Sequence, residues 1–511
     1  MSPALRRLPL LACLLWGTGA CAQSQPAVEV RRPAVAGQFY PADGEELRAA
    51  VDAFWEDALP PAPLRPIALV VPHAGYIYSG QVAADAYRQA EGGQYDVVVV
   101  IGTNHTTPGY RGVSVDQASG HRTPLGVLPA DAELSAALAA ADPLFAYRPE
   151  VHQGEHSVEV QLPFVQARWP SARVVAAVVG GPDPEVAARF GRAVARLVRD
   201  RRALVVASSD LSHYPPAAQA AQVDAAVLSA VASLDPAAVV RIVAQELDRG
   251  VPNLATCACG EGAVLAAMAA ASELGARRGR VVRYAHSGWT AFGEDDRVVG
   301  YGAVAFDPGE GGPDTAALAV PAAEDGSGPH LALADREYLL RLARATVTRY
   351  LTSHTVPLPR LDTPGLARRQ GAFVTLKKAG ALRGCIGHMA EDTPLALTVT
   401  RMALQAALRD QRFTPVRRDE LADLEVEVSV LTPFTAVAGP QAVVVGRDGV
   451  LLEKSGHRAV FLPQVAPEQG WDRDEMLGQL CQKGGLPADC WQEGARLSTF
   501  QAEVFAEAAG H

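Results

Sequence analysis

Short apolar runs alternate with longer Ala-rich stretches over the first three fifths of the chain. The runs predict buried strands at Ile67–Val71, Val97–Ile101, Val174–Val179 and Leu204–Ala207. The longer stretches predict helices at Gly44–Phe54, Ala130–Ala141, Pro184–Asp200 and Ala218–Val231. This alternation predicts an α/β domain in which a mostly parallel sheet is flanked by helices.

The pattern changes after residue 306. Residues 307–330 are rich in Gly, Pro, Ala and acidic side chains and lack hydrophobic periodicity, which predicts a solvated linker. A chain of 511 residues is also too long for one core, so we expect two folded units, residues 31–306 and 331–507. In the second unit the pattern predicts a smaller α+β domain. Helices are expected at Ala334–Ser353, Pro394–Arg409 and Asp474–Lys483, and strands at Ala372–Lys377 and Leu424–Leu431.

Residues 1–22 have the pattern of a secretory signal peptide. Arg6 and Arg7 precede an apolar stretch that is too short to span a bilayer, and small residues follow through Ala22. Cleavage after Ala22 and lipidation at Cys21, in a weak bacterial lipobox, both stay open. We therefore expect an exported protein, periplasmic or anchored as a lipoprotein; the alternative is a start codon placed upstream of a cytosolic protein.

Charge and cysteine content narrow the classes of partner. The net charge is −10 and no stripe of Lys and Arg with interleaved aromatics occurs, which argues against nucleic acid. A membrane contact is expected only through a lipid anchor at Cys21. Beyond the signal, five cysteines are too few and too scattered for a disulfide framework. A local Cys481–Cys490 bridge is the one pairing to consider.

Three side chains that can bind a metal stand beside predicted elements of the first unit. His73 follows the run that ends at Val71, and His105 follows the run that ends at Ile101. Ligands bind at this edge of an open α/β sheet. Cys259 precedes a predicted helix, whose dipole and unpaired amides stabilise a thiolate. Two imidazoles and one thiolate are typical of an open, catalytic site and favour copper, iron or zinc.

Further acid and histidine side chains lie close together in the sequence. Asp210 and His213 fit positions that orient a ligand or move protons, and His156, beside Glu155, fits either a ligand or a catalytic role. A structural role stays open for each of these histidines. Cys257 is most simply explained as a small packed residue.

Arg383, Cys385 and His388 form a second candidate site. The intervening glycines permit a tight turn. A guanidinium or imidazolium beside a thiol lowers its pKa, which favours a nucleophilic or redox role. A well-packed turn with a buried cysteine is the alternative.

Six separated motifs of the first unit resemble the Memo family, the AmmeMemoRadiSam system protein B. They are, in chain order, Pro33–Pro41, Pro72–Tyr76, His121–Gly126, Glu155–Phe164, Ser209–Tyr214 and Cys259-Gly260. The resemblance implies a fold like that of class III extradiol dioxygenases. It places the metal ligands on His73, His105 and Cys259, the cysteine followed directly by glycine, and the remaining pocket positions on Asp210, His213 and His156. It also implies copper- or iron-dependent redox chemistry on a small molecule.

Residues 331–507 resemble the AMMECR-type domain, protein A of the same system. The matching motifs are Leu382–His388, Asp410–Val416, Leu424–Leu431 and Phe461–Trp471. The chain is thus similar to a fusion of proteins B and A, and the resemblance implies partner proteins of that system. The third of them, a radical SAM enzyme, is normally cytosolic, so an export signal would separate it from this chain.

Three functions stay open at this point. A metal-dependent oxidoreductase with an accessory second domain is preferred. An extradiol-type iron dioxygenase normally has a carboxylate ligand where Cys259 stands, which makes cleavage of a catechol ring doubtful. A non-catalytic module that holds a metal or a ligand is the third.

Overall fold

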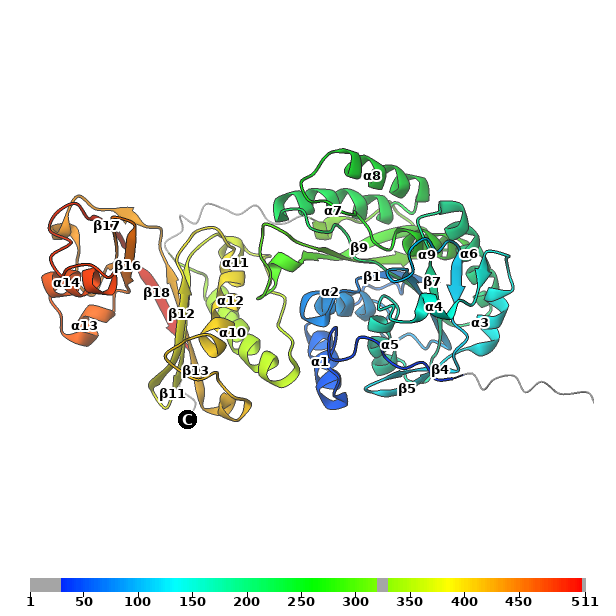
Figure 1. The fold of residues 1–511 in the computed structure, drawn as a ribbon, viewed down its shortest axis with the longest axis horizontal. Coiled ribbons are helices and arrows are strands. Elements are labelled where there is room, and N and C mark those ends of the chain that lie inside the picture. Colours follow the sequence, from blue (N-terminus) through cyan, green and yellow to red (C-terminus); the bar gives the residue numbers. More distant parts are fainter. Residues whose placement is uncertain (1–28, 319–329, 508–511) are drawn as a thin grey trace, which may run out of the picture.

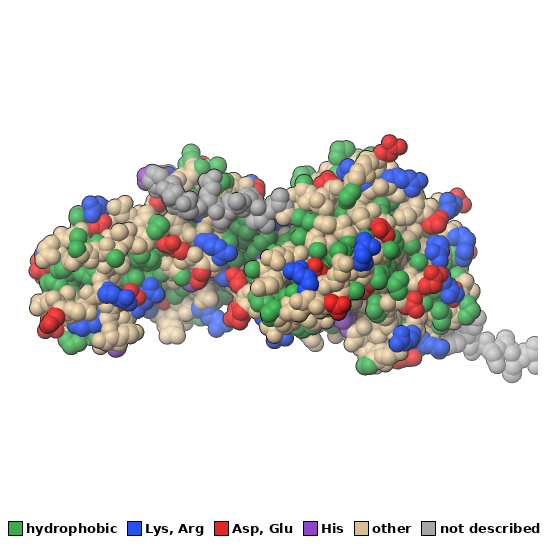
Figure 2. Space-filling model, turned by 90° about the horizontal axis from the view of Figure 1, so that it is seen from above, with side chains coloured by type: hydrophobic (Ala, Val, Ile, Leu, Met, Phe, Trp, Pro, Cys, Tyr) green, Lys and Arg blue, Asp and Glu red, His purple; other side chains and the backbone are tan. Residues whose placement is uncertain are grey.

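The computed structural model describes residues 29–318 and 330–507, which form two units side by side (Figure 1). The predicted signal peptide, with Cys21, lies outside the described residues. Within them, no helix combines the length and the apolar character needed to cross a membrane. On the face in Figure 2, basic and acidic side chains are interspersed, with no extended area of one sign.

An eight-stranded mixed sheet organises the first unit (Figure 1). Its strands, in spatial order, are β6 (Phe145–Ala146), β3 (Val113–Val115), β7 (Arg173–Val179), β2 (Val97–Thr103), β8 (Ala203–Ser208), β1 (Ala68–Val71), β10 (Gly300–Asp307) and β9 (Arg278–His286). The four central strands, β7 to β1, run parallel, whereas β10 and β9 add an antiparallel edge. A separate hairpin joins β4 (Gly120–Thr123) to β5 (Gly126–Pro129).

Helices cover both faces of this sheet. Because successive side chains of a strand point to opposite faces, Val97 and Val99 join one core and Val98 and Val100 the other. One face carries α1 (Gly44–Asp57), α2 (Tyr76–Arg88) and α5 (Leu162–Arg168). The other carries α3 (Ala132–Ala139), α6 (Pro184–Val198), α7 (Ala217–Ala232), α8 (Pro236–Asp248) and α9 (Glu261–Glu273). Short helical segments complete the unit: α4 (Pro149–His152), η1 (Glu159–Gln161) and η2 (Ser287–Trp289).

The second unit contains two antiparallel sheets of four strands. The first has the order β12 (Ala381–His388), β11 (Ala372–Lys378), β13 (Leu424–Leu431) and β18 (Ala502–Ala506); the second has β14 (Thr435–Ala436), β17 (Arg496–Phe500), β15 (Gly449–Lys454) and β16 (His457–Phe461). The helices are α10 (Leu333–Ser353), α11 (Pro364–Ala367), α12 (Leu395–Leu408), α13 (Val465–Gln469) and α14 (Arg473–Lys483), with η4 (Arg418–Asp423) and η5 (Pro440–Ala442). An α/β unit followed by an α+β unit is the predicted fold class, which is confirmed.

The turn predicted around Cys385 is wrong, because this segment is strand β12, paired with β11 along its length. The two glycines serve close packing instead. A Cβ atom at Gly384 would lie 2.2 Å from the carbonyl oxygen of Ala406 on α12, and one at Gly387 would lie 2.2 Å from the ring of Phe373. A glycine pattern alone does not distinguish a turn from a strand covered at close range.

Part of the predicted linker packs against the first unit. Strand β10 continues to Asp307, whose buried carboxylate lies 3.0 Å from the Arg280 guanidinium. Asp314 then extends the edge beside β9, since its N–H donates to Gly279 at 2.9 Å and its carbonyl accepts from Val281 at 2.8 Å. The segment next forms η3 (Ala316–Leu318), and residues 319–329 lie outside the described part of the chain.

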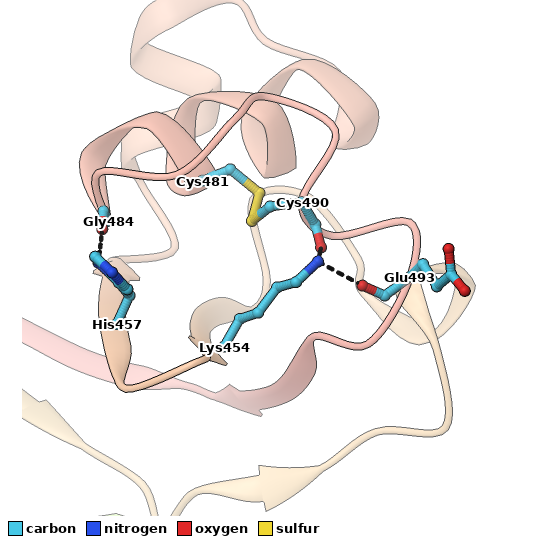
Figure 3. The surroundings of a disulfide bond; sticks show 6 residues. All are labelled: Lys454, His457, Cys481, Gly484, Cys490 and Glu493. Atoms are coloured by element: carbon cyan, nitrogen blue, oxygen red, sulfur yellow. Dashed lines mark hydrogen bonds between the residues drawn. A yellow bond between two sulfur atoms is a disulfide. The ribbon is translucent and has the colours of Figure 1, made fainter.

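A disulfide joins Cys481, on α14, to Cys490, in the loop between α14 and β17 (Figure 3). Lys454 supports the same loop, because its ammonium donates to the backbone oxygens of Cys490 and Glu493 at 3.0 and 2.6 Å. The local pairing considered from the sequence is therefore formed.

Candidate metal centre

The candidate residues of the first unit converge at one edge of the large sheet. His73, His105 and Asp210 each lie two residues beyond the end of a strand, β1, β2 and β8 respectively. These strands are parallel neighbours, so their carboxyl ends meet. The loop before η1 brings His156 to the same place.

Three imidazoles form the tightest group. The ligand atoms of His73, His105 and His156 all lie within 4.8 Å of one another. The rings of His105 and His156 stack with centroids 4.5 Å apart, and the ring of His73 stands nearly perpendicular to both, at 5.2 and 5.4 Å. His156 is therefore placed as well for metal binding as for catalysis.

Cys259 lies beside this group without being a member of it. Its Sγ atom is 3.1 Å from His73 Nε2, and the residue precedes α9, whose N-cap is Gly260. Burial raises the pKa of the Cys259 thiol, and the Asp210 carboxylate raises it further. The stabilisation expected from the helix is thus outweighed, and a bound cation would be needed for the thiolate to prevail.

A hydrogen-bond chain fixes the tautomer of His73. The hydroxyl of Ser208 donates to the carbonyl of Ser157 at 2.6 Å and accepts from Gln161 Nε2 at 2.9 Å. With its proton committed, Ser208 Oγ accepts from His73 Nδ1, at 2.9 Å. His73 Nε2 is left with its lone pair, which faces Cys259 and is free to bind a metal.

Glu155 holds His105 in the same way. Its carboxylate lies 3.0 Å from His105 Nδ1 and accepts from the backbone N–H groups of His105 and Ser157 at 2.6 and 2.8 Å. Burial alone would raise the pKa of Glu155, but these hydrogen bonds lower it to about 2. No role for Glu155 was predicted from the sequence. Its position before His156 was the only available hint, because His105 lies fifty residues away in the chain.

Asp210 and His213 complete the pocket. Asp210 accepts from the His73 backbone N–H at 2.7 Å, and its second oxygen lies 4.0 Å from His73 Nε2. Burial raises the pKa of Asp210 and lowers the pKa of His213. Within the described ranges, His213 Nε2 is buried and has no hydrogen-bond partner. These opposite shifts bring the proton affinities of the two side chains closer together.

The donors fit a first-row transition metal. Burial, helped by repulsion between neighbouring imidazoles, lowers the pKa of His73 and of His156, so both are neutral, as metal ligands must be. Nitrogen and sulfur donors suit copper, iron or zinc, whereas magnesium and calcium prefer oxygen.

The three residues of the second candidate site each find separate partners. Arg383 pairs with Glu420 at 2.9 Å and His388 with Asp392 at 2.7 Å. Along β12, Cys385 and His388 alternate onto opposite faces, and Cys385 Sγ accepts from the Thr375 hydroxyl at 3.2 Å. The structure does not bring this trio together.

The guanidinium beside the backbone of Cys385 belongs instead to Arg412. It donates to the carbonyl oxygen of Cys385 at 3.1 Å and pairs with Asp410 at 2.7 Å. Asp410 in turn accepts from the Cys385 N–H at 2.8 Å.

Comparisons with known proteins agree with this two-unit organisation. The family described as Memo-like protein matches residues 31–305, and the family described as AMMECR1 matches residues 340–505. The chain therefore belongs to the Memo-like family and carries an AMMECR1 domain after the Memo-like one.

Three similar proteins come from archaea. The MEMO1 family protein MK0963 of Methanopyrus kandleri is 38% identical over 288 residues, which cover 54% of this chain and 98% of that protein. Protein TK0174 of Thermococcus kodakarensis is 45% identical over 183 residues, or 34% of this chain and 89% of its own length. The crystal structure of PH0010 from Pyrococcus horikoshii, 42% identical, covers 34% of this chain and 90% of its own, with a TM-score of 0.32.

Proposed function

We propose that the protein is a metal-dependent redox protein, in which the Memo-like unit is a copper- or iron-dependent oxidoreductase for a small molecule and the AMMECR1 domain is accessory. The observation that supports this proposal is the convergence of His73, His105 and His156 at the sheet edge, with Cys259 Sγ 3.1 Å from His73 Nε2. Ser208 and Glu155 engage the Nδ1 atoms of the two imidazoles, which leaves both Nε2 atoms available.

In this proposal His73, His105 and Cys259 hold the metal, and His156 either adds a fourth donor or contacts the substrate. The bound metal would supply one-electron chemistry and polarise a ligand at an open position. Asp210 accepts the backbone N–H of His73, and burial raises its pKa, which favours proton transfer at this position. His213 is neutral and can accept a proton at Nε2.

A second candidate is an iron dioxygenase of the extradiol type. The observation in its favour is the carboxylate oxygen of Asp210, 4.0 Å from His73 Nε2. Together with His73 and His105, this oxygen could provide the two-histidine, one-carboxylate donor set of non-haem iron oxygenases. Cys259 would then lie beside the metal without binding it.

Oxygen uptake by protein loaded with copper or with iron tests the proposal. Uptake with ascorbate by the copper form supports the oxidoreductase, and uptake with catechol by the iron form supports the dioxygenase. Asp210→Asn and His213→Gln should keep the metal and lose at least tenfold in rate. Cys257→Ala, which removes a buried thiol outside the site, is the matched control. Tight metal binding without uptake under either condition would leave a binding module and contradict an enzyme.

We also propose that the chain is exported, from the signal pattern of residues 1–22. Cell fractionation and the mass of the mature N-terminus test this. A protein that retains Met1 in the cytosol would contradict it.

A further inference from the structure

A cavity of about 540 Å³ lies where the two units meet. Helix α2 and strand β9 of the first unit line one side, and α10 with residues 357–362 of the second unit line the other. Trp289 and Tyr338 line it, together with Leu342 and the β9 residues Val282 to Tyr284. Cavities of this size at domain interfaces commonly hold small organic ligands.

Two buried oxygen atoms in the wall have no hydrogen-bond donor among the described residues. They are Gln81 Oε1 and Asp85 Oδ2, from side chains that are 6% and 1% exposed and lie one turn apart on α2. The opposite end of each group is fixed. Gln81 Nε2 donates to the carbonyl of Phe54 at 3.0 Å, and Asp85 Oδ1 accepts from the N–H of Leu59 at 2.8 Å.

These fixed contacts show that the cavity wall lacks hydrogen-bond donors for the two oxygen atoms. Because Gln81 Nε2 is committed, the amide cannot exchange its oxygen for its nitrogen without losing a bond. A buried acceptor without a donor is costly, so the wall favours a ligand that brings N–H groups. Two acceptors one helical turn apart suit a head group with two such donors.

The formal charges around the cavity balance. Asp57, Asp85 and Asp362 are matched by Arg283, Arg341 and Arg360. Arg360 pairs with Asp362 at 2.6 Å, whereas Arg283 Nε lies 3.8 Å from Asp85 Oδ2, beyond hydrogen-bond distance. Net charge therefore does not select the ligand. The selection comes from Gln81 Oε1 and Asp85 Oδ2, the two oxygen atoms that have no hydrogen-bond donor among the described residues.

We propose that this cavity binds a small, uncharged aromatic molecule with a primary-amide head, whose N–H groups reach Gln81 and Asp85 and whose ring packs between Trp289 and Tyr338. The site is separate from the candidate metal centre. Asp85 lies nine residues beyond Tyr76, the first residue of α2, or about 14 Å along that helix. Because both units form its walls, the ligand would also hold them together.

Indole-3-acetamide and indole-3-acetate are matched probes for this site. They share a ring and differ in the head, which has two N–H donors in the amide and only acceptors in the acetate. Calorimetry on the full chain should show saturable binding of the amide in the millimolar range or tighter, at least tenfold tighter than the acetate.

Two variants test the two sides of the cavity. Asp85→Asn keeps the acceptor for Leu59 but replaces the free oxygen with a donor, so the preference for the amide should fall to about twofold or reverse. Ala345→Trp fills the cavity from α10 and should abolish binding without touching α2. Metal content serves as the control and should not change in either variant.

No saturable binding of the amide, equal binding of both probes, or an unchanged preference in Asp85→Asn would overturn the proposal. Continued binding to Ala345→Trp would overturn it as well, since the ligand would then lie elsewhere.

Discussion

Glu155 and His105 are joined twice, because the carboxylate accepts the backbone N–H of His105 at 2.6 Å and also lies 3.0 Å from its Nδ1 atom. One side chain thus fixes both the main chain and the ring of a candidate ligand. The carboxylate stays ionised over the physiological range, since hydrogen bonding lowers its pKa to about 2 against the effect of burial. It therefore keeps the proton of His105 on Nδ1.

Glu155→Gln should weaken metal binding by about 10- to 100-fold, because the amide no longer fixes the tautomer or the angle of the His105 ring. Competition with a chelator measures the affinity. The matched control is Glu159→Gln, four residues along the chain. Glu159 anchors the N-terminal segment through Ala34, Val35 and Tyr40, so this control should lower stability and leave metal affinity nearly unchanged. Equal losses of affinity in both variants would contradict the role given to Glu155.

Asp224 predicts a specific dependence of stability on pH. It is fully buried, and burial raises its pKa to about 7 despite hydrogen bonds from Ser212 and Tyr284. The unfolded carboxyl group titrates near pH 4, so between about pH 4 and 7 the folded state binds the extra proton. Its contribution to stability is present at low pH and is lost as pH rises toward 7.

Asp224→Asn removes this titration. The free energy of unfolding of the variant, minus that of the wild type, should rise by about 3 kcal/mol between about pH 5 and pH 8. Guanidinium chloride unfolding at the two pH values measures this change. Ser229→Ala, an exposed position on the same helix, is the control and should give the same difference at both. A constant difference for Asp224→Asn would show that Asp224 is ionised in the folded state.

Arg401 should couple the two units. Its guanidinium, from α12, donates to the carbonyls of Gly288 and Gly293 at 2.6 and 2.9 Å. Arg401→Met leaves these acceptors without a donor and should weaken the contact by about 2 kcal/mol, seen as two separated thermal transitions in calorimetry. Arg349→Met removes a more exposed pair with Asp57 across the same contact and should have a much smaller effect. A single unchanged transition in Arg401→Met would contradict the coupling.

The Cys481–Cys490 disulfide closes a short loop, with a sequence separation of nine. Replacing both cysteines by alanine should lower the stability of the second unit by about 2–3 kcal/mol, because the unfolded chain gains freedom. Thermal unfolding measures the loss, and metal content should stay the same. Cys385→Ala, which leaves the disulfide intact, is the control. No change in stability on losing the disulfide would contradict this account.

The sequence predicted most of the fold because the strands that bury both faces leave uninterrupted apolar runs. It also placed His73 and His105 correctly at the ends of strands, since parallel strands share an edge. It did not reveal that Glu155 orients His105, because that contact joins loops far apart in the chain. The prediction of a turn at residues 383–388 was wrong, because glycine is needed both in turns and where Ala406 and Phe373 approach a strand.

The metal content of protein purified from its native compartment tests the central claim most directly. The wild type should carry about one copper or iron ion per chain by elemental analysis. His73→Ala, His105→Ala and Cys259→Ser should lose it, and Cys257→Ala and His330→Ala should keep it. Full metal content in both His73→Ala and Cys259→Ser would contradict a shared metal site.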